Sequence, residues 1–62
     1  MNTEKLYNSD LDKWETKENI IHIIMDMGYT EEEAENEINY SIKQGILYTE
    51  EGYQKHFAPY EN

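Results

Sequence analysis

Apolar residues recur at helical spacing in the first half of the chain. Four of them fall at positions i, i+3, i+4 and i+7, which places them on one face of a helix: Ile20, Ile23, Ile24 and Met27. Thr16 precedes this stretch and is a residue type that caps helix N-termini through its hydroxyl. Gly28 follows it and adopts at no steric cost the left-handed conformation that ends a helix. The pattern therefore predicts a first helix over residues 16–27.

A capping box and a second apolar line predict another helix over residues 31–44. Thr30 and Glu33 stand three residues apart, the spacing at which each side chain bonds to the other's backbone amide. The apolar line behind them repeats every four residues: Ala34, Ile38 and Ile42. Gly45 then ends this helix as Gly28 ends the first.

After the second helix, the chain changes to short runs of branched and aromatic residues. Residues 46–48 and 53–57 are typical of strands, and residues 49–52 separate them. The sequence therefore predicts a β-hairpin of these two runs with a four-residue turn. Such a hairpin would place Tyr48 opposite Tyr53 as an aromatic cross-strand pair.

The N-terminal part gives weaker signals. Residues 1–8 show no periodicity, and we expect them to be flexible. Ser9 is a capping residue type, and the apolar spacing behind it predicts a short helix over residues 10–15. No linker interrupts the remainder, so the sequence indicates a single domain over residues 9–58 and a C-terminal tail over residues 59–62.

The order helix, tight turn, helix and predicted hairpin resembles the core of a winged-helix domain. The residues that carry this resemblance are Ile20 to Met27, Gly28 to Thr30, Ala34 to Ile42 and Gly45 to Phe57. It implies a small α+β fold in which the second helix reads DNA. Two features depart from the family pattern. The segment 10–15 is shorter than the usual first helix, and the second helix is acidic where that of the family is usually basic.

The run Met27-Gly28-Tyr29 resembles the first loop of a ubiquitin-associated (UBA) domain, a compact three-helix module. This resemblance covers about residues 18–42. It implies that the loop contributes to a ubiquitin-binding surface. It also implies a third helix over residues 49–57, which would hold Gly52 in its interior.

The negative charge of the chain is concentrated in its predicted helical centre. The net charge at pH 7 is −9, and residues 18–44 account for −6 of it. Coulomb repulsion therefore opposes contact with nucleic-acid phosphates or with an anionic membrane, and it favours a protein partner with a basic surface. The longest apolar stretch is too short to span a membrane, and the N-terminus lacks an apolar signal region. We therefore expect a cytoplasmic protein.

Small size limits the core. A chain of 62 residues buries only about 60% of its unfolded surface on folding. It contains no cysteine, so neither disulfides nor thiolate metal sites can support it. A protein partner or a homodimer would supply part of the burial that the domain itself lacks.

Residues of catalytic or metal-ligating type form no motif. Glu18, His22 and Asp26 share one face of the first helix, which is the arrangement expected of a solvated polar stripe. The other histidine, His56, is far away in the sequence, and there is neither a nucleophile motif nor a glycine-rich phosphate loop. We expect no enzymatic activity, no metal and no cofactor.

The exposed face of the second helix is the strongest candidate for binding a partner. Its candidate contact residues are Glu32, Glu33, Glu35, Glu37 and Tyr40. They predict a small acidic protein-binding module that docks on a basic, nucleic-acid-binding protein surface by imitating nucleic acid. Such an inhibitor or adaptor is of a kind common among small phage and mobile-element proteins. The alternatives are a DNA-binding winged-helix regulator and a UBA-like adaptor.

Overall fold

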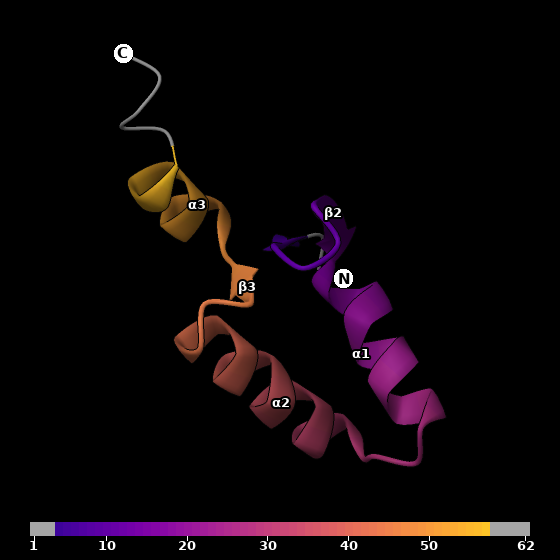
Figure 1. The fold of residues 1–62 in the computed structure, drawn as a ribbon. Coiled ribbons are helices and arrows are strands. Elements are labelled where there is room, and N and C mark those ends of the chain that lie inside the picture. Colours follow the sequence, from indigo (N-terminus) through magenta and orange to yellow (C-terminus); the bar gives the residue numbers. More distant parts are fainter. Residues whose placement is uncertain (1–3, 58–62) are drawn as a thin grey trace.

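The structure is a computed structural model that describes residues 4–57 of the chain, so the predicted tail over residues 59–62 lies outside it. The predicted mixed α+β class is confirmed, because the described residues contain helices and an antiparallel sheet. The elements in chain order are β1 (Lys5–Asn8), β2 (Lys13–Thr16), α1 (Lys17–Asp26), α2 (Glu31–Lys43), β3 (Leu47–Tyr48) and α3 (Glu50–His56). In Figure 1, β3 lies between α2 and α3, and β2 lies at the start of α1.

Strand β1 is the centre of the sheet, whose strand order is β2-β1-β3. β2 pairs with it antiparallel and places Leu6 opposite Glu15 and Tyr7 opposite Trp14. β3 pairs antiparallel with its other edge and places Tyr48 opposite Tyr7. Because successive side chains of a strand point to opposite faces, Leu6 and Tyr7 enter two different layers of the molecule.

The N-terminal segment differs from its prediction. Residues 5–8, expected to be flexible, form the central strand, and the short helix predicted over residues 10–15 is wrong, because these residues form a hairpin turn and the start of β2. Asn8 directs the turn, since its side-chain Oδ1 accepts hydrogen bonds from the amides two and three residues further on at 2.9 and 3.1 Å. Asp12 then has a φ of 53°, which a right-handed helix does not contain.

Helices α1 and α2 form as predicted, within one residue of the expected ends. The Thr16 hydroxyl oxygen caps α1 by accepting a hydrogen bond from the amide three residues on, at 3.2 Å. The predicted capping box of α2 is present: the Glu33 amide donates to Thr30 Oγ1 at 3.1 Å, and the Thr30 amide donates to Glu33 Oε1 at 2.9 Å. Gly28 and Gly45 follow the two helices with φ of 101° and 80°, where a side chain would strain the backbone.

The hydrophobic core lies between one face of the sheet and the pair of helices α1 and α2. Its buried residues come from β1, α2 and β3: Leu6, Ala34, Ile38 and Leu47. Partly buried isoleucines pack against them: Ile20, Ile21, Ile24 and Ile42. The predicted apolar line of α2 therefore faces the core, whereas α1 contributes no fully buried residue.

The predicted hairpin of residues 46–48 and 53–57 is wrong in its second strand. Residues 50–56 form α3, which Thr49 caps by accepting a hydrogen bond from the Gly52 amide at 2.9 Å. β3 pairs with β1 instead of with residues 53–57. A Cβ at Gly52 would lie 3.2 Å from the Thr49 hydroxyl oxygen, so the glycine leaves room for this cap. Residues 4–57 therefore contain no wing after the second helix.

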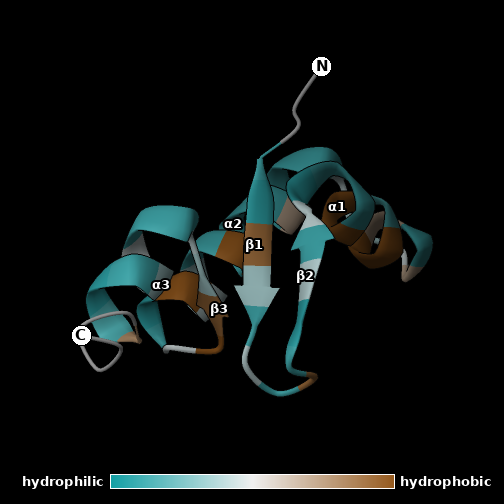
Figure 2. Cartoon of the chain, turned by 90° about the horizontal axis from the view of Figure 1, so that it is seen from above, coloured by the Kyte–Doolittle hydropathy of each residue, from teal (hydrophilic) through white to brown (hydrophobic). Residues whose placement is uncertain are grey.

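Helix α3 covers the face of the sheet opposite the core. Tyr53 and Phe57 stand four residues apart, so they share one side of the chain as it passes through the helix and its C-cap. Their ring centroids lie 4.9 and 5.6 Å from that of Tyr7. Trp14 extends the contact, with its centroid 5.0 Å from that of Tyr53. In Figure 2, α1 and α3 lie on opposite sides of the β1–β2 hairpin.

We expect Ile38→Ala to lower the free energy of unfolding by about 2–5 kcal/mol, because truncating a buried side chain leaves a cavity. Ile38 is 1% exposed. Ile42 lies one turn further on and is only partly buried, so Ile42→Ala is a matched control with a smaller expected loss. Urea unfolding followed by circular dichroism measures both. Equal losses would contradict this placement of the core.

Candidate functional site

The five predicted contact residues are all exposed on α2, but they do not form one patch. At roughly 3.6 residues per turn, Glu33, Glu37 and Tyr40 share one edge of the helix. Tyr40 is the aromatic residue of α2, and 58% of its surface is exposed. Glu32 and Glu35 lie toward the other edge, and Glu35 is the one beside α1. The structure therefore divides the predicted site into two edges of one helix.

Two of these glutamates have a partner within the chain. The Glu33 carboxylate closes the capping box on the Thr30 amide, so it has a structural role. Glu35 Oε1 lies 3.5 Å from Lys17 Nζ, and the two side chains are 51% and 21% exposed. An exposed pair of this kind contributes about 0–1 kcal/mol, so a competing cation could displace Lys17 at little cost. The side chains of Glu32 and Glu37 form no hydrogen bond or ion pair with any residue in 4–57.

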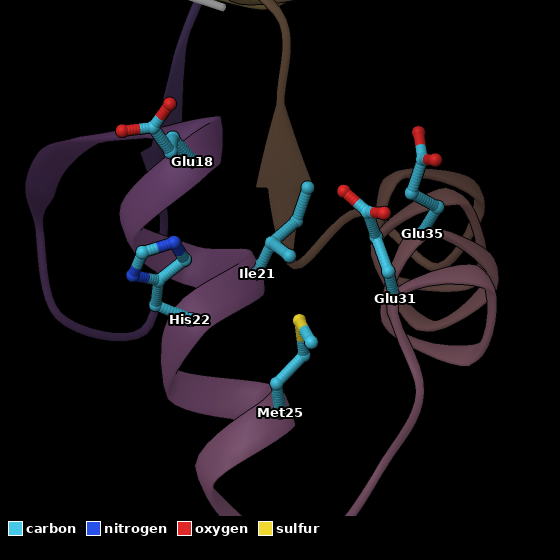
Figure 3. A pocket seen from close by; sticks show the side chains of 6 residues that line it. All are labelled: Glu18, Ile21, His22, Met25, Glu31 and Glu35. Carbon is cyan, nitrogen blue, oxygen red and sulfur yellow. The ribbon is translucent and has the colours of Figure 1, made fainter.

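An open acidic hollow lies between α1 and α2, on the Glu35 edge (Figure 3). Its volume is about 470 Å³, and it is lined by Glu18, Ile21, His22, Met25, Glu31 and Glu35. Ile21 and Met25 point from α1 toward α2, and Glu31 points toward them from α2. This combination suits a long basic side chain, whose methylene groups pack on apolar walls while its charged end meets carboxylates.

The sequence pattern indicates only part of this hollow. Glu18 and His22 belong to the predicted polar stripe of the first helix and line the hollow, whereas Asp26 of the same stripe does not. Glu31 is not among the predicted contact residues. Its spacing of four from Glu35 was a visible signal, because residues four apart on a helix are neighbours. The packing of α1 on α2 brings Glu18 and His22 to the same hollow as Glu31 and Glu35. The spacing of residues along each helix does not reveal this packing.

The hollow has no arrangement that fits a metal ion. Among residues 4–57, no group of three or more His, Asp or Glu side chains is placed to hold one. The carboxylates here stand on two separate helices around an open space, which matches a basic side chain better than a compact oxygen cage.

The tyrosines predicted as a cross-strand pair have another role. Tyr48 and Tyr53 both contact Tyr7, with ring centroids 6.4 and 4.9 Å away from it. They hold α3 on the sheet and are only partly exposed. Trp14, at the edge of the same aromatic layer, keeps 39% of its surface exposed. The aromatic layer is therefore mainly structural, and Tyr40 on α2 is separate from it.

No family model matches the chain, and searches of curated proteins and of solved structures find no significant match either. The likenesses to winged-helix and UBA domains accordingly rest on residue patterns alone. Within residues 4–57, no helix is both long enough and apolar enough to cross a bilayer.

The Tyr7 hydroxyl donates a hydrogen bond to Asp12 Oδ1 at 2.5 Å. This bond, together with burial and the nearby negative charge, raises the pKa of Tyr7 from 10.0 to about 12. Because the folded-state pKa is raised, the contact stabilises the fold fully below pH 10. That contribution is lost as the pH rises toward 12.

A spectrophotometric titration should therefore show one tyrosine that ionises near pH 12, and Tyr7→Phe should remove it. Asp12→Asn keeps an acceptor and tolerates the left-handed backbone but removes the charge, so it should lower the pKa of Tyr7. An unchanged late step in Tyr7→Phe would contradict the assignment.

Proposed function

We propose that this chain is an acidic protein-binding module, an inhibitor or adaptor that acts by binding rather than by catalysis. Helix α2 docks on the basic, nucleic-acid-binding surface of another protein. The observation that carries this proposal is that Glu32, Glu37 and Tyr40 are exposed on a capped helix. The capping box and the buried Ala34 and Ile38 fix that helix on the body of the domain.

The acidic hollow adds a specific contact to this electrostatic surface. A lysine or arginine of the partner that enters between α1 and α2 meets Glu31 and Glu35 beside Ile21 and Met25. The partner's cation would replace Lys17 as the neighbour of Glu35. Long-range attraction by the net charge of −9 speeds the encounter, and the hollow and Tyr40 supply short-range selectivity.

The two alternative functions have less support from the contacts. A winged-helix regulator needs a wing after its second helix, and residues 50–56 form α3 there. A UBA-like adaptor needs three helices packed together, whereas α3 lies on the far face of the sheet, against Tyr7 and Trp14. In favour of that adaptor, Met27 and Tyr29 of the α1–α2 loop are 65% and 44% exposed.

The protein should not bind duplex DNA measurably at physiological salt, because α2 carries carboxylates where a DNA reader carries cations. A fluorescence anisotropy titration of labelled random-sequence duplex checks this. Binding tighter than about 1 µM would overturn the proposal and support the regulator.

Changing Glu32, Glu35 and Glu37 together to Gln should leave the melting temperature nearly unchanged, because exposed carboxylates on a helix contribute only tenths of a kcal/mol each. Glu33 is spared because it closes the capping box. If α2 docks on a basic partner, the same triple change should slow association and flatten its salt dependence. Affinity capture from a lysate of the source organism supplies the partner, and stopped-flow kinetics then measure association.

The matched control is the triple variant Asp10→Asn, Glu50→Gln and Glu51→Gln. It removes the same charge from exposed residues outside α2. It should keep most of the association rate and of the salt slope. Equal effects of the two triple variants would show that only the total charge matters and that α2 is not the interface.

A further inference from the structure

An aliphatic groove opens on the edge of α1 opposite the acidic hollow. Its volume is about 300 Å³, and it lies between the β1–β2 turn, the two long helices and the start of β3. The core residues Ile38 and Leu47 are among its lining residues. Three other apolar lining residues, each on a different segment, stay open to solvent: Leu11 is 62% exposed, Ile23 51% and Ile46 37%. Large apolar side chains exposed around one groove are typical of an interaction site.

Carboxylates border this groove on both long helices. On α1, Asp26 lies three residues after the lining residue Ile23, and on α2, Glu37 lies four residues before the lining residue Ser41. Residues at these spacings are neighbours on the surface of a helix. Both carboxylates are on exposed residues. The Glu37 edge of α2 and the aliphatic groove are therefore adjoining parts of one surface.

The charge around the groove selects a cationic occupant. Lys13 is the cation among the lining residues, and its Nζ lies 3.2 Å from Oε2 of Glu15, another lining residue. That pair is neutral as a whole, so the surplus charge at the border is negative. A ligand with an anionic end, or a second copy of a chain of net charge −9, meets repulsion there. An apolar segment that also carries lysine or arginine is attracted instead.

The positions of Asp26 and Glu37 also indicate the form of this occupant. Because they stand on different sides of the groove, the occupant needs cations on both sides of one apolar row. A basic amphipathic helix has this pattern, since polar residues border its apolar stripe on both sides. On a strand the polar side chains point to the opposite face, away from the groove. A volume at the lower end of the range of about 300–1,000 Å³ for ligand pockets suits a few aliphatic side chains.

We propose that the aliphatic groove binds a basic amphipathic helix of the partner protein. Aliphatic side chains at positions i, i+3 and i+4 of that helix enter the groove, and its flanking cations meet Asp26 and Glu37. The proposal deepens the proposed function and rests on it, because it names the segment by which a basic protein partner docks. The acidic hollow lies on the other edge of α1 and stays open to a further basic side chain.

Two synthetic leucine–lysine peptides of about 15 residues, a length at which an isolated helix becomes stable, test this occupant. In one peptide the leucines recur at helical spacing, and in the other the same residues are scrambled so that no apolar face forms. Fluorescence anisotropy titrations with the full chain should show that the amphipathic peptide binds at least about tenfold more tightly. Equal affinities would show that charge alone attracts the peptides and would overturn the proposal.

Two single variants place the amphipathic peptide in the groove. Leu11→Ser and Ile23→Gln should each weaken its binding at least about fivefold, since each removes an apolar side chain that the contact buries. Tyr29→Ser is the matched control, because Tyr29 is exposed in a loop and lines neither the groove nor the hollow. Circular dichroism verifies folding, and Leu11→Ser, in a turn, decides the matter if Ile23→Gln unfolds. Unchanged binding by the folded groove variants would refute the proposal.

A double variant tests the acidic border. Asp26→Asn with Glu37→Gln should flatten the salt dependence of amphipathic-peptide binding more than Glu50→Gln with Glu51→Gln, which removes the same charge from α3. Equal salt slopes would contradict the proposed pairing. Sedimentation velocity of the chain alone should show a monomer. A dimer that Leu11→Ser abolishes would assign the groove to a second copy and overturn the proposal.

Failure of the groove and failure of the proposed function give different results. If the two peptides bind equally while the triple variant of α2 still slows association with the partner, the groove proposal fails and docking by α2 stands. If the amphipathic peptide stays selective for the groove while the α2 triple variant matches its control, docking by α2 fails and the groove remains the binding site.

Discussion

The position of β1 between two unlike layers is the constraint on which the rest of the structure depends. Leu6 points to one side and is 1% exposed among the aliphatic core residues. Tyr7 points to the other side, where its ring contacts Trp14, Tyr53 and Phe57. The same strand pairs with β2 and β3. Without β1, α3 would lose the surface on which it packs, and the inner face of α2 would lose its partner.

The parts of the fold that depend on neighbouring residues could be predicted from the sequence. Caps at Thr16 and Thr30 and glycines at positions 28 and 45 fix the two long helices, and each signal lies within a few residues of the element it bounds. The pairing of β1 with β3 has no local signal, because both long helices separate Tyr7 from Tyr48 in the sequence. Tyr53 and Phe57 stand four residues apart, a spacing that places two side chains on one side of a helix and also on one face of a strand. The sequence pattern alone therefore does not distinguish the two, and the distinction depends on how this segment packs on the sheet.

The candidate site was predictable to a similar extent. Exposure of the α2 glutamates follows from the apolar line of Ala34 and Ile38, because the opposite side of an amphipathic helix faces water. The division of the site into two edges, and the hollow between α1 and α2, depend on how the second helix is turned against the first. Composition carries no information about that rotation. The ion pair of Lys17 with Glu35 likewise joins two elements whose contact only the tertiary structure sets.

Stability accounts for some of the acidic residues of α2, and those that it leaves unaccounted for are the most informative about function. Glu31, Glu32 and Glu33 occupy the first turn, where the helix dipole favours negative charge, and Glu33 also closes the cap. The Glu37 side chain lies beyond the first turn and has no ion pair or hydrogen bond with residues 4–57, and Tyr40 beside it exposes more than half of its surface. Neither the cap nor the helix dipole accounts for the Glu37–Tyr40 edge, whereas the first-turn glutamates would be expected in this helix with or without a partner.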